Sequence, residues 1–175
     1  MLRLATREQH QALDASVGMT SFDSREQYIQ FLRASYQAVA PLESTLEPWL
    51  GADYAPVRAE RIVGDLTQLN AVSALNAEPA AWRPESAAQA WGCAYVLEGS
   101  ALGGAVLALR ARQRLGADLP CRYLSPSTSD TPLRWKWFLA ALESFAYAAS
   151  ESAREQCVYG AVKTFEVFGA AFKSR

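Results

Sequence analysis

Apolar residues recur every three or four positions along almost the whole chain, and no convincing run alternates apolar with polar residues as a half-buried strand would. The spacing is clearest in segment 28–39, at Tyr28, Phe31, Leu32, Ser35, Tyr36 and Val39. Residues at these intervals share one face of a helix. The pattern predicts an all-α protein, and the sequence contains no internal repeat.

Local signals predict where the first two helices lie. The first is expected over residues 2–15. A capping box at Ser24–Gln27 is expected to open the second, because the serine and the glutamine can satisfy each other's free backbone amides. Either Pro41 or Pro48 should kink or end this helix, since proline cannot donate the helical hydrogen bond.

Prolines and glycines punctuate the middle of the chain. Pro56 suits the first turn of a third helix that runs to about Leu75, with Ile62, Leu66 and Leu69 turned inward. Residues 84–116 follow the same logic, because Pro84 can open a fourth helix and Gly116 can stop it after Leu115.

The C-terminal third of the chain predicts two more helices. Residues 117–130 carry two prolines and several hydroxyl residues, which is typical of a connection. Thr131 and Pro132 resemble a cap and first turn that open a fifth helix. The last helix has one apolar face, formed by Val158, Ala161, Val162, Phe165, Phe168 and Phe172. We therefore expect residues 1–175 to form one all-α domain, a multi-helix bundle.

Composition narrows the partners. Of the 175 residues, 50% are hydrophobic and 20% charged, which is ordinary for a globular protein with one buried core. The formal net charge of −1 argues against nucleic acid as the main partner, because phosphate binding usually requires a basic excess.

The cysteines and the first residues indicate a compartment. Cys93, Cys121 and Cys157 are odd in number and include no Cys-x-x-Cys pair, so neither a disulfide framework nor a zinc site follows. The first ten residues contain no apolar stretch of signal-peptide length. We expect a cytoplasmic protein.

Residues 91–109 form an almost continuous apolar run with a Gly-x-x-x-Gly spacing, followed by three arginines. Taken alone, this run could span a membrane. Glu98 near its middle would cost about 2.5–3.5 kcal/mol on the insertion scale. The buried central helix of an all-α domain explains the same run, and we expect no membrane span.

The only histidine of the chain suggests a metal ligand. His10 shares a broad helical face with Arg3, Arg7 and Asp14, so Asp14 could orient the imidazole while the arginines hold anionic groups. A solvent-facing charged stripe explains the pattern equally simply. Protein-only zinc and iron sites gather three or four ligands. If His10 binds metal, the ligand must bring most of the coordination itself, as a porphyrin does.

Four glycines lie within thirteen residues of the fourth helix. Each costs up to about 1 kcal/mol relative to alanine inside a helix, so their presence needs a reason. Gly92, Gly99 and Gly103 follow one stripe, with Gly104 beside it. A bare backbone could receive a flat ligand, or it could let another helix approach closely. The spacing alone does not decide between these two readings.

Two motifs carry a resemblance to a known family. The first covers residues 5–14, Ala-Thr-x-x-x-His with Leu-Asp, and the second covers residues 95–104, Tyr-Val-Leu-Glu-Gly-Ser-x-Leu-Gly-Gly. In this order and about ninety residues apart, they resemble the haem oxygenase family, particularly its small bacterial members. Further matches are Lys136 and residues 163–164 in the last two helices.

The resemblance implies a haem between a proximal helix that carries the axial histidine and a kinked, glycine-rich distal helix. His10 would be the iron ligand, and Asp14 stands where the family often has its acidic partner. Gly99, Gly103 and Gly104 would form the distal backbone over the iron.

The resemblance also implies contacts at the haem edge. Arg3 and Lys136 correspond best to the basic residues that pair with the propionates, and Arg7 is a substitute. Phe165 and Phe172 could wall the edge, although aromatic residues at that spacing are more often plain core.

One distal position departs from the family. Better-known members have an aspartate there that organises water, and aligning the glycines places Ser100 at it. A hydroxyl can order water but cannot hold charge as a carboxylate does. We expect Gly99, Ser100 and Gly103 to be the catalytic positions and Tyr95, one turn earlier, to border the haem.

The implied activity is oxidative cleavage of haem b to biliverdin with release of CO and ferrous iron. Molecular oxygen would be consumed, and electrons would come from an external donor of the ferredoxin or reductase type, because the chain has no flavin, nicotinamide or iron–sulfur motif. Two alternatives stay open: a haem carrier or sensor without turnover, and a protein of the same fold that acts on another small ligand.

Overall fold

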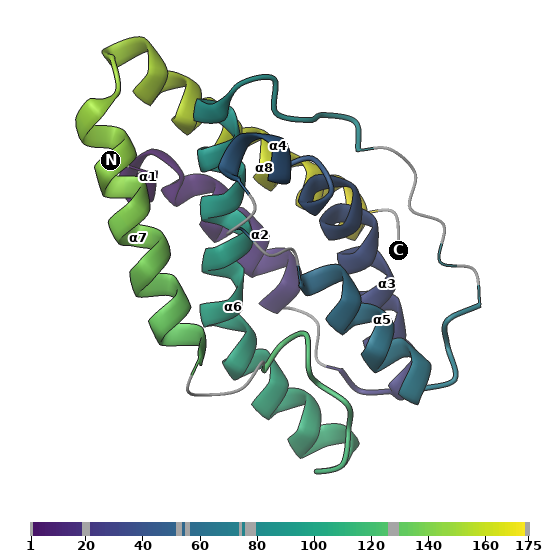
Figure 1. The fold of residues 1–175 in the computed structure, drawn as a ribbon. Coiled ribbons are helices and arrows are strands. Elements are labelled where there is room, and N and C mark those ends of the chain that lie inside the picture. The colour runs from purple at the N-terminus through teal and green to yellow at the C-terminus, as the bar shows by residue number, and fades with distance from the viewer. Residues whose placement is uncertain are drawn as a thin grey trace.

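The computed structural model describes residues 2–18, 22–51, 54, 57–73, 75, 80–125 and 130–173, without the side chains of residues 14, 16–18 and 130–132. Every regular element in these ranges is a helix (Figure 1). They are α1 (Leu2–Ala5), α2 (Arg7–Gly18), α3 (Arg25–Glu43), α4 (Glu47–Leu50), α5 (Arg58–Gln68), α6 (Ala87–Leu115), α7 (Asp130–Ala148) and α8 (Glu151–Lys173). The expected all-α class is confirmed.

Local capping explains the boundaries of α3 and α6. The Gln27 amide donates to the Ser24 hydroxyl at 3.2 Å, and the Asp23 amide donates to the Gln27 side chain at 2.9 Å. At α6, the Ser86 hydroxyl accepts from the Gln89 amide at 3.2 Å. Gly116 ends α6 in the left-handed region with φ +113°, which glycine adopts without strain.

Two predicted helices in the first half of the chain differ from the structure. Thr6 separates α1 from α2, and its hydroxyl donates to the Leu2 carbonyl at 2.9 Å, a side-chain bond that competes with the helical ladder. The third helix ends at Gln68 rather than Leu75, because Asn70 adopts a left-handed φ of +54°.

Smaller differences concern the prolines. Helix α3 passes through Pro41 and ends at Glu43, whereas Pro48 lies in the first turn of α4, a helix that the sequence did not predict. Helix α6 begins after Ser86 rather than at Pro84. Helix α7 begins at Asp130, one residue before the predicted threonine cap.

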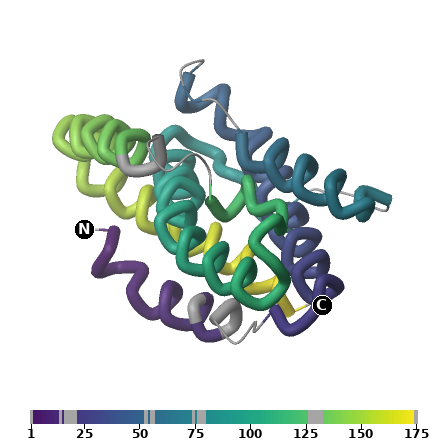
Figure 2. Tube along the Cα trace, turned by 90° about the horizontal axis from the view of Figure 1, so that it is seen from below, coloured from purple at the N-terminus to yellow at the C-terminus, as the bar shows by residue number. Residues whose placement is uncertain are grey.

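Helices α6 and α8 form the centre of the fold, and their contact is the most extensive between any two elements. Figure 2 shows α1 and α2 on one side of α6 and α5 on the other. One core cluster of buried apolar side chains is described, and α3, α5, α6 and α8 all contribute to it. Helix α6 is long and apolar enough to cross a membrane, but this position in the core and its buried Glu98 explain its composition without one.

Candidate functional site

A cavity of about 1460 Å³ lies between the first two helices and α6, and it extends along α7 and α8. It exceeds the range of about 300–1,000 Å³ that is common for small-molecule pockets. Ten of the residues expected at the site line it: Arg3, Arg7, His10, Tyr95, Gly99, Ser100, Gly103, Gly104, Phe165 and Phe172. The structure therefore brings the two sequence motifs to opposite walls of one cavity.

His10 stands on α2 and is partly exposed toward this cavity. Its ring meets Phe165 of α8 edge-on, with centroids 4.6 Å apart and planes at 63°. Among the residues that the structure describes, no three histidine, cysteine or acidic side chains gather as a metal site. A metal at His10 would need most of its ligands from elsewhere.

The glycines of α6 divide into two kinds. A Cβ on Gly92 would lie 1.9 Å from the Cys157 carbonyl oxygen, and one on Gly104 would lie 2.5 Å from the Leu124 carbonyl oxygen. These two positions are bare because neighbouring backbone approaches them. A Cβ on Gly103 would meet nothing within 4 Å, and one on Gly99 only the Trp135 ring at 3.6 Å. Both readings of the stripe are therefore realised, at different glycines.

The cations around the cavity differ partly from the expected set. Arg3 and Arg7 line it and are exposed, but Lys136 is exposed on α7 and is not part of the lining. Arg110 of α6 and Arg154 of α8 also line the cavity. Sequence reasoning missed these two because nothing local distinguishes them from surface arginines.

The remaining expected residues fall into three groups. Residue 14 lies on α2, but its side chain is outside the part described. Tyr95 packs its ring against Trp135 at 5.6 Å, and burial raises the pKa of its hydroxyl. Phe165 is buried, whereas Phe172 is partly buried and stacks on Phe31 at 5.6 Å.

Ser100 lies on the cavity wall with its hydroxyl already engaged. Its Oγ donates to the Leu97 carbonyl at 2.7 Å. A hydroxyl has one hydrogen and two lone pairs, so the Ser100 oxygen can still accept a hydrogen bond. In this arrangement Ser100 would act toward a water in the cavity as an acceptor.

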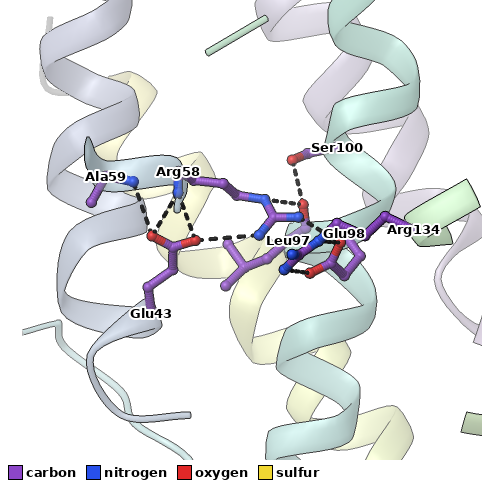
Figure 3. Close-up of polar contacts among 7 residues, drawn as sticks. All are labelled: Glu43, Arg58, Ala59, Leu97, Glu98, Ser100 and Arg134. Carbon is purple, nitrogen blue, oxygen red and sulfur yellow. Dashed lines mark hydrogen bonds and ion pairs between the residues drawn. The ribbon is translucent and has the colours of Figure 1, made fainter. Parts of the chain in front are cut away.

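A buried ion network lies directly behind this segment (Figure 3). Arg58 donates from Nε to the Leu97 carbonyl at 2.8 Å and contacts the Glu98 carboxylate from Nη2 at 2.8 Å and the Glu43 carboxylate from Nη1 at 3.2 Å. Arg134 of α7 closes the network with bonds of 2.8 and 2.9 Å to Glu98. The side chains of Glu43, Arg58 and Glu98 are no more than 5% exposed.

The network holds its charges in their ionised forms. Burial alone would raise the pKa of Glu98, but hydrogen bonds from Arg134 and the charge of Arg58 outweigh it and hold that pKa below its ordinary value. Glu43 also accepts the backbone amides of Arg58 and Ala59 at 2.9–3.1 Å, so it satisfies the free N–H groups that open α5.

Sequence reasoning missed this network and also Trp135. Glu98 was recognisable as a charge inside an apolar helix, which is a signal that a buried partner exists. Its partners lie 40 residues before it and 36 residues after it, as the difference in numbering to Arg58 and Arg134 shows. No local pattern could identify them.

Comparisons with known proteins agree with this geometry. The family model described as "Heme oxygenase" matches residues 1–174. A protein named "Heme oxygenase" from Xanthomonas campestris pv. campestris (strain 8004) is 32% identical over 148 residues, which cover 81% of this chain and 86% of the relative.

A solved structure has the same architecture. It is the NO- and CO-bound heme oxygenase from Neisseria meningitidis, with a TM-score of 0.75 and 22% sequence identity. The match covers 99% of this chain and 88% of the other. At this identity the likeness supports the fold, and the family model and the Xanthomonas relative support the family.

Proposed function

Because this chain belongs to the haem oxygenase family, we propose that its cavity binds haem between His10 and the bare face of α6 and that the protein cleaves it to biliverdin. Haem is the substrate and supplies the iron at which oxygen is activated. The single observation that carries the proposal is that His10 and the open glycines Gly99 and Gly103 line one cavity. CO and ferrous iron are the other products expected of this family.

The residues present fit a porphyrin better than a bare metal ion. A porphyrin brings four nitrogen donors and needs only an axial ligand, which matches one imidazole. The cavity wall is largely apolar, and flat apolar surface can lie against Gly103 without meeting a side chain. Arg3 and Arg7 place positive charge at its exposed side, where carboxylates can pair with them.

On the proximal side we assign three roles. His10 binds the iron through a neutral ring nitrogen, and Asp14 accepts a hydrogen bond from the other nitrogen, which fixes the tautomer and the ring plane. Phe165 restricts rotation of the imidazole through its edge-on contact. A neutral imidazole gives the iron less electron density than a thiolate would.

On the distal side the chain contributes space and a single hydroxyl. Gly99 and Gly103 leave room for a diatomic molecule over the porphyrin. Ser100 donates to Leu97, so its oxygen accepts from a water and orients that water's other hydrogen into the cavity. This is how a serine can serve where a carboxylate is common in the family.

Further assignments concern the haem edge and the electron source. Arg3 and Arg7 pair with the propionates, Tyr95 and Phe172 border the ring, and Gly104 contributes backbone to the wall. Lys136 would need to reach the edge from outside the lining. We also propose an external ferredoxin- or reductase-type donor and a cytoplasmic location.

The proposal is tested by titrating the protein with hemin and then adding a reductant and oxygen. We expect one haem per chain, followed by loss of the Soret band and growth of a biliverdin band. His10→Ala should lose the axial ligand and about 100-fold or more of the turnover rate. Glu8→Ala, on an exposed position of α2 outside the cavity lining, is the matched control and should behave as wild type.

The same titration separates the alternatives. Stoichiometric binding without loss of the Soret band would favour a carrier or sensor. Failure to bind hemin would contradict the proposal and favour another ligand in the same fold.

A further inference from the structure

The bare part of α6 lacks the means to hold its own position. A helix is normally fixed against its neighbours by side chains, and Gly103 meets nothing within 4 Å while Gly99 meets only the Trp135 ring. Some other contact must set the distance between this backbone and a ligand in the cavity. The residues immediately before Gly99 provide one.

Leu97 and Glu98 are both held by Arg58. The Leu97 carbonyl accepts the Arg58 Nε at 2.8 Å, and the Glu98 carboxylate receives the Arg58 Nη2 at 2.8 Å. The guanidinium is planar, so these two contacts fix one rigid group against two consecutive residues of α6. Its third contact, to Glu43 at the end of α3, ties the group to another element of the core.

The contact at Leu97 also affects the helix itself. That carbonyl accepts the Ser100 hydroxyl at 2.7 Å as well as Arg58. A carbonyl oxygen has two lone pairs, so two side-chain donors compete there with the helical amide of residue 101. Side chains inserted into the helical ladder bend helices, and Figure 1 shows α6 changing direction along its length.

Stability alone is a poor explanation for these buried charges. Exchanging a buried ion pair for well-packed apolar residues is often neutral or stabilising, so such a pair is weak evidence of a stabilising role. Here the charges meet immediately before the cavity-facing glycines, and Arg134 brings α7 to the same carboxylate.

We propose that Arg58 is a positioning residue that fixes the cavity-facing segment 99–104 of α6 through the Leu97 carbonyl and the Glu98 carboxylate. This inference rests on the proposed haem site for its purpose, but the mechanical claim concerns the protein alone. Arg58→Lys keeps the charge and removes the planar fork. Glu43→Gln is the matched control, because it weakens the contact of the same arginine on the side away from α6.

Amide hydrogen exchange on the full chain without haem tests the claim directly. Losing a hydrogen bond to a charged group costs about 1.5–3 kcal/mol, so we expect amides 97–104 to exchange about tenfold faster or more in Arg58→Lys. In Glu43→Gln the faster exchange should be confined to the start of α5. If Arg58→Lys does not fold, Arg134→Lys, whose side chain is 35% exposed, should show the same local effect.

A spectroscopic measurement tests the consequence for the site. In the ferrous complex with hemin and CO, the C–O stretching band should shift or broaden in Arg58→Lys and stay at the wild-type position in Glu43→Gln. Unchanged exchange at 97–104, or acceleration spread evenly over all helices, would overturn the inference. Failure of wild type to bind hemin would overturn the proposed function, and the exchange result would still decide the positioning role.

Discussion

The first half of α6 lies against α8, and its second half borders the cavity. Gly92 in the first half is in contact with backbone of α8, where its missing Cβ would lie 1.9 Å from the Cys157 oxygen and 2.7 Å from the Ala161 nitrogen. Gly103 in the second half has open space at the same position. One residue type on one helix thus serves two physical purposes.

The comparison shows that a small-residue stripe does not by itself identify a binding face. Gly92, Gly99 and Gly103 have regular helical spacing, yet only the last two face the cavity without a backbone neighbour. Gly104 lines the cavity but is small because the Leu124 carbonyl approaches it. Substitutions that add one methyl group should separate the two kinds.

The largest effect is expected at Gly92. In Gly92→Ala, α8 must move away from α6, because both clashing atoms belong to backbone that cannot rotate aside. We expect the free energy of unfolding to fall by about 3 kcal/mol or more. Denaturant unfolding measures this. Gly169→Ala on α8, where nothing lies within 4 Å, is the control and should be neutral or slightly stabilising. Equal stability of the two variants would remove the distinction between the halves.

Glu98→Gln tests the ion network at the junction of the two halves. We expect a loss of about 2 kcal/mol at neutral pH, because a neutral amide replaces the carboxylate that two arginines contact. The folded pKa of Glu98 is lowered, so its contribution is fully present above the unfolded value and is lost as pH falls through the folded one.

The pH dependence of that variant is therefore informative. The stability difference between wild type and Glu98→Gln should shrink as pH falls below the ordinary range of a glutamate. Thermal unfolding across pH 3–7 measures it, where the range spans the model value of 4.5. A difference that stays constant over this range would contradict the ionised network.

Gly104→Ala should have an intermediate effect. The added Cβ would lie 2.5 Å from the Leu124 oxygen, so segment 119–125 must shift. That segment is held by Asp65, whose carboxylate accepts the amides of Arg122 and Tyr123 at 2.9 Å. We expect a loss of about 1–2 kcal/mol and a changed absorption spectrum of the hemin complex, since Leu124 lines the cavity. A spectrum identical to wild type would show that this wall does not touch the haem.

The smallest effect on stability is expected at Gly103. Gly103→Ala places a methyl group in open space and improves helix propensity, so unfolding should be unchanged or up to about 1 kcal/mol less favourable. The haem site should nevertheless change, because the methyl group occupies the face where a diatomic ligand would lie. Product analysis and the CO-bound spectrum check this. A destabilised variant with wild-type turnover would reverse the comparison.

Several features of the fold could be predicted because their signals are local. The capping box at Ser24 and the stop at Gly116 depend on residues within a few positions of each other, and both are confirmed. The inward positions Ile62 and Leu66 follow from helical spacing and are fully buried. The break at Thr6 was not predictable by spacing, because it depends on a threonine hydroxyl choosing a backbone partner.

The site was predictable in its residue types but not in its support. The motifs around His10 and Gly99 indicated a slot, and the structure places both on one cavity. The assignment of Gly104 to a bare face, by contrast, depended on knowing where residue 124 lies. The partners of Glu98 come from two other helices, so tertiary packing alone brings them together.

A crystal structure of the protein with hemin bound is the most direct test of the central claim. We predict the iron bonded to the imidazole nitrogen of His10, with the opposite porphyrin face against the backbone of Gly99 and Gly103. A porphyrin bound outside this cavity, or an iron ligated by another residue while His10 points into solvent, would contradict the account.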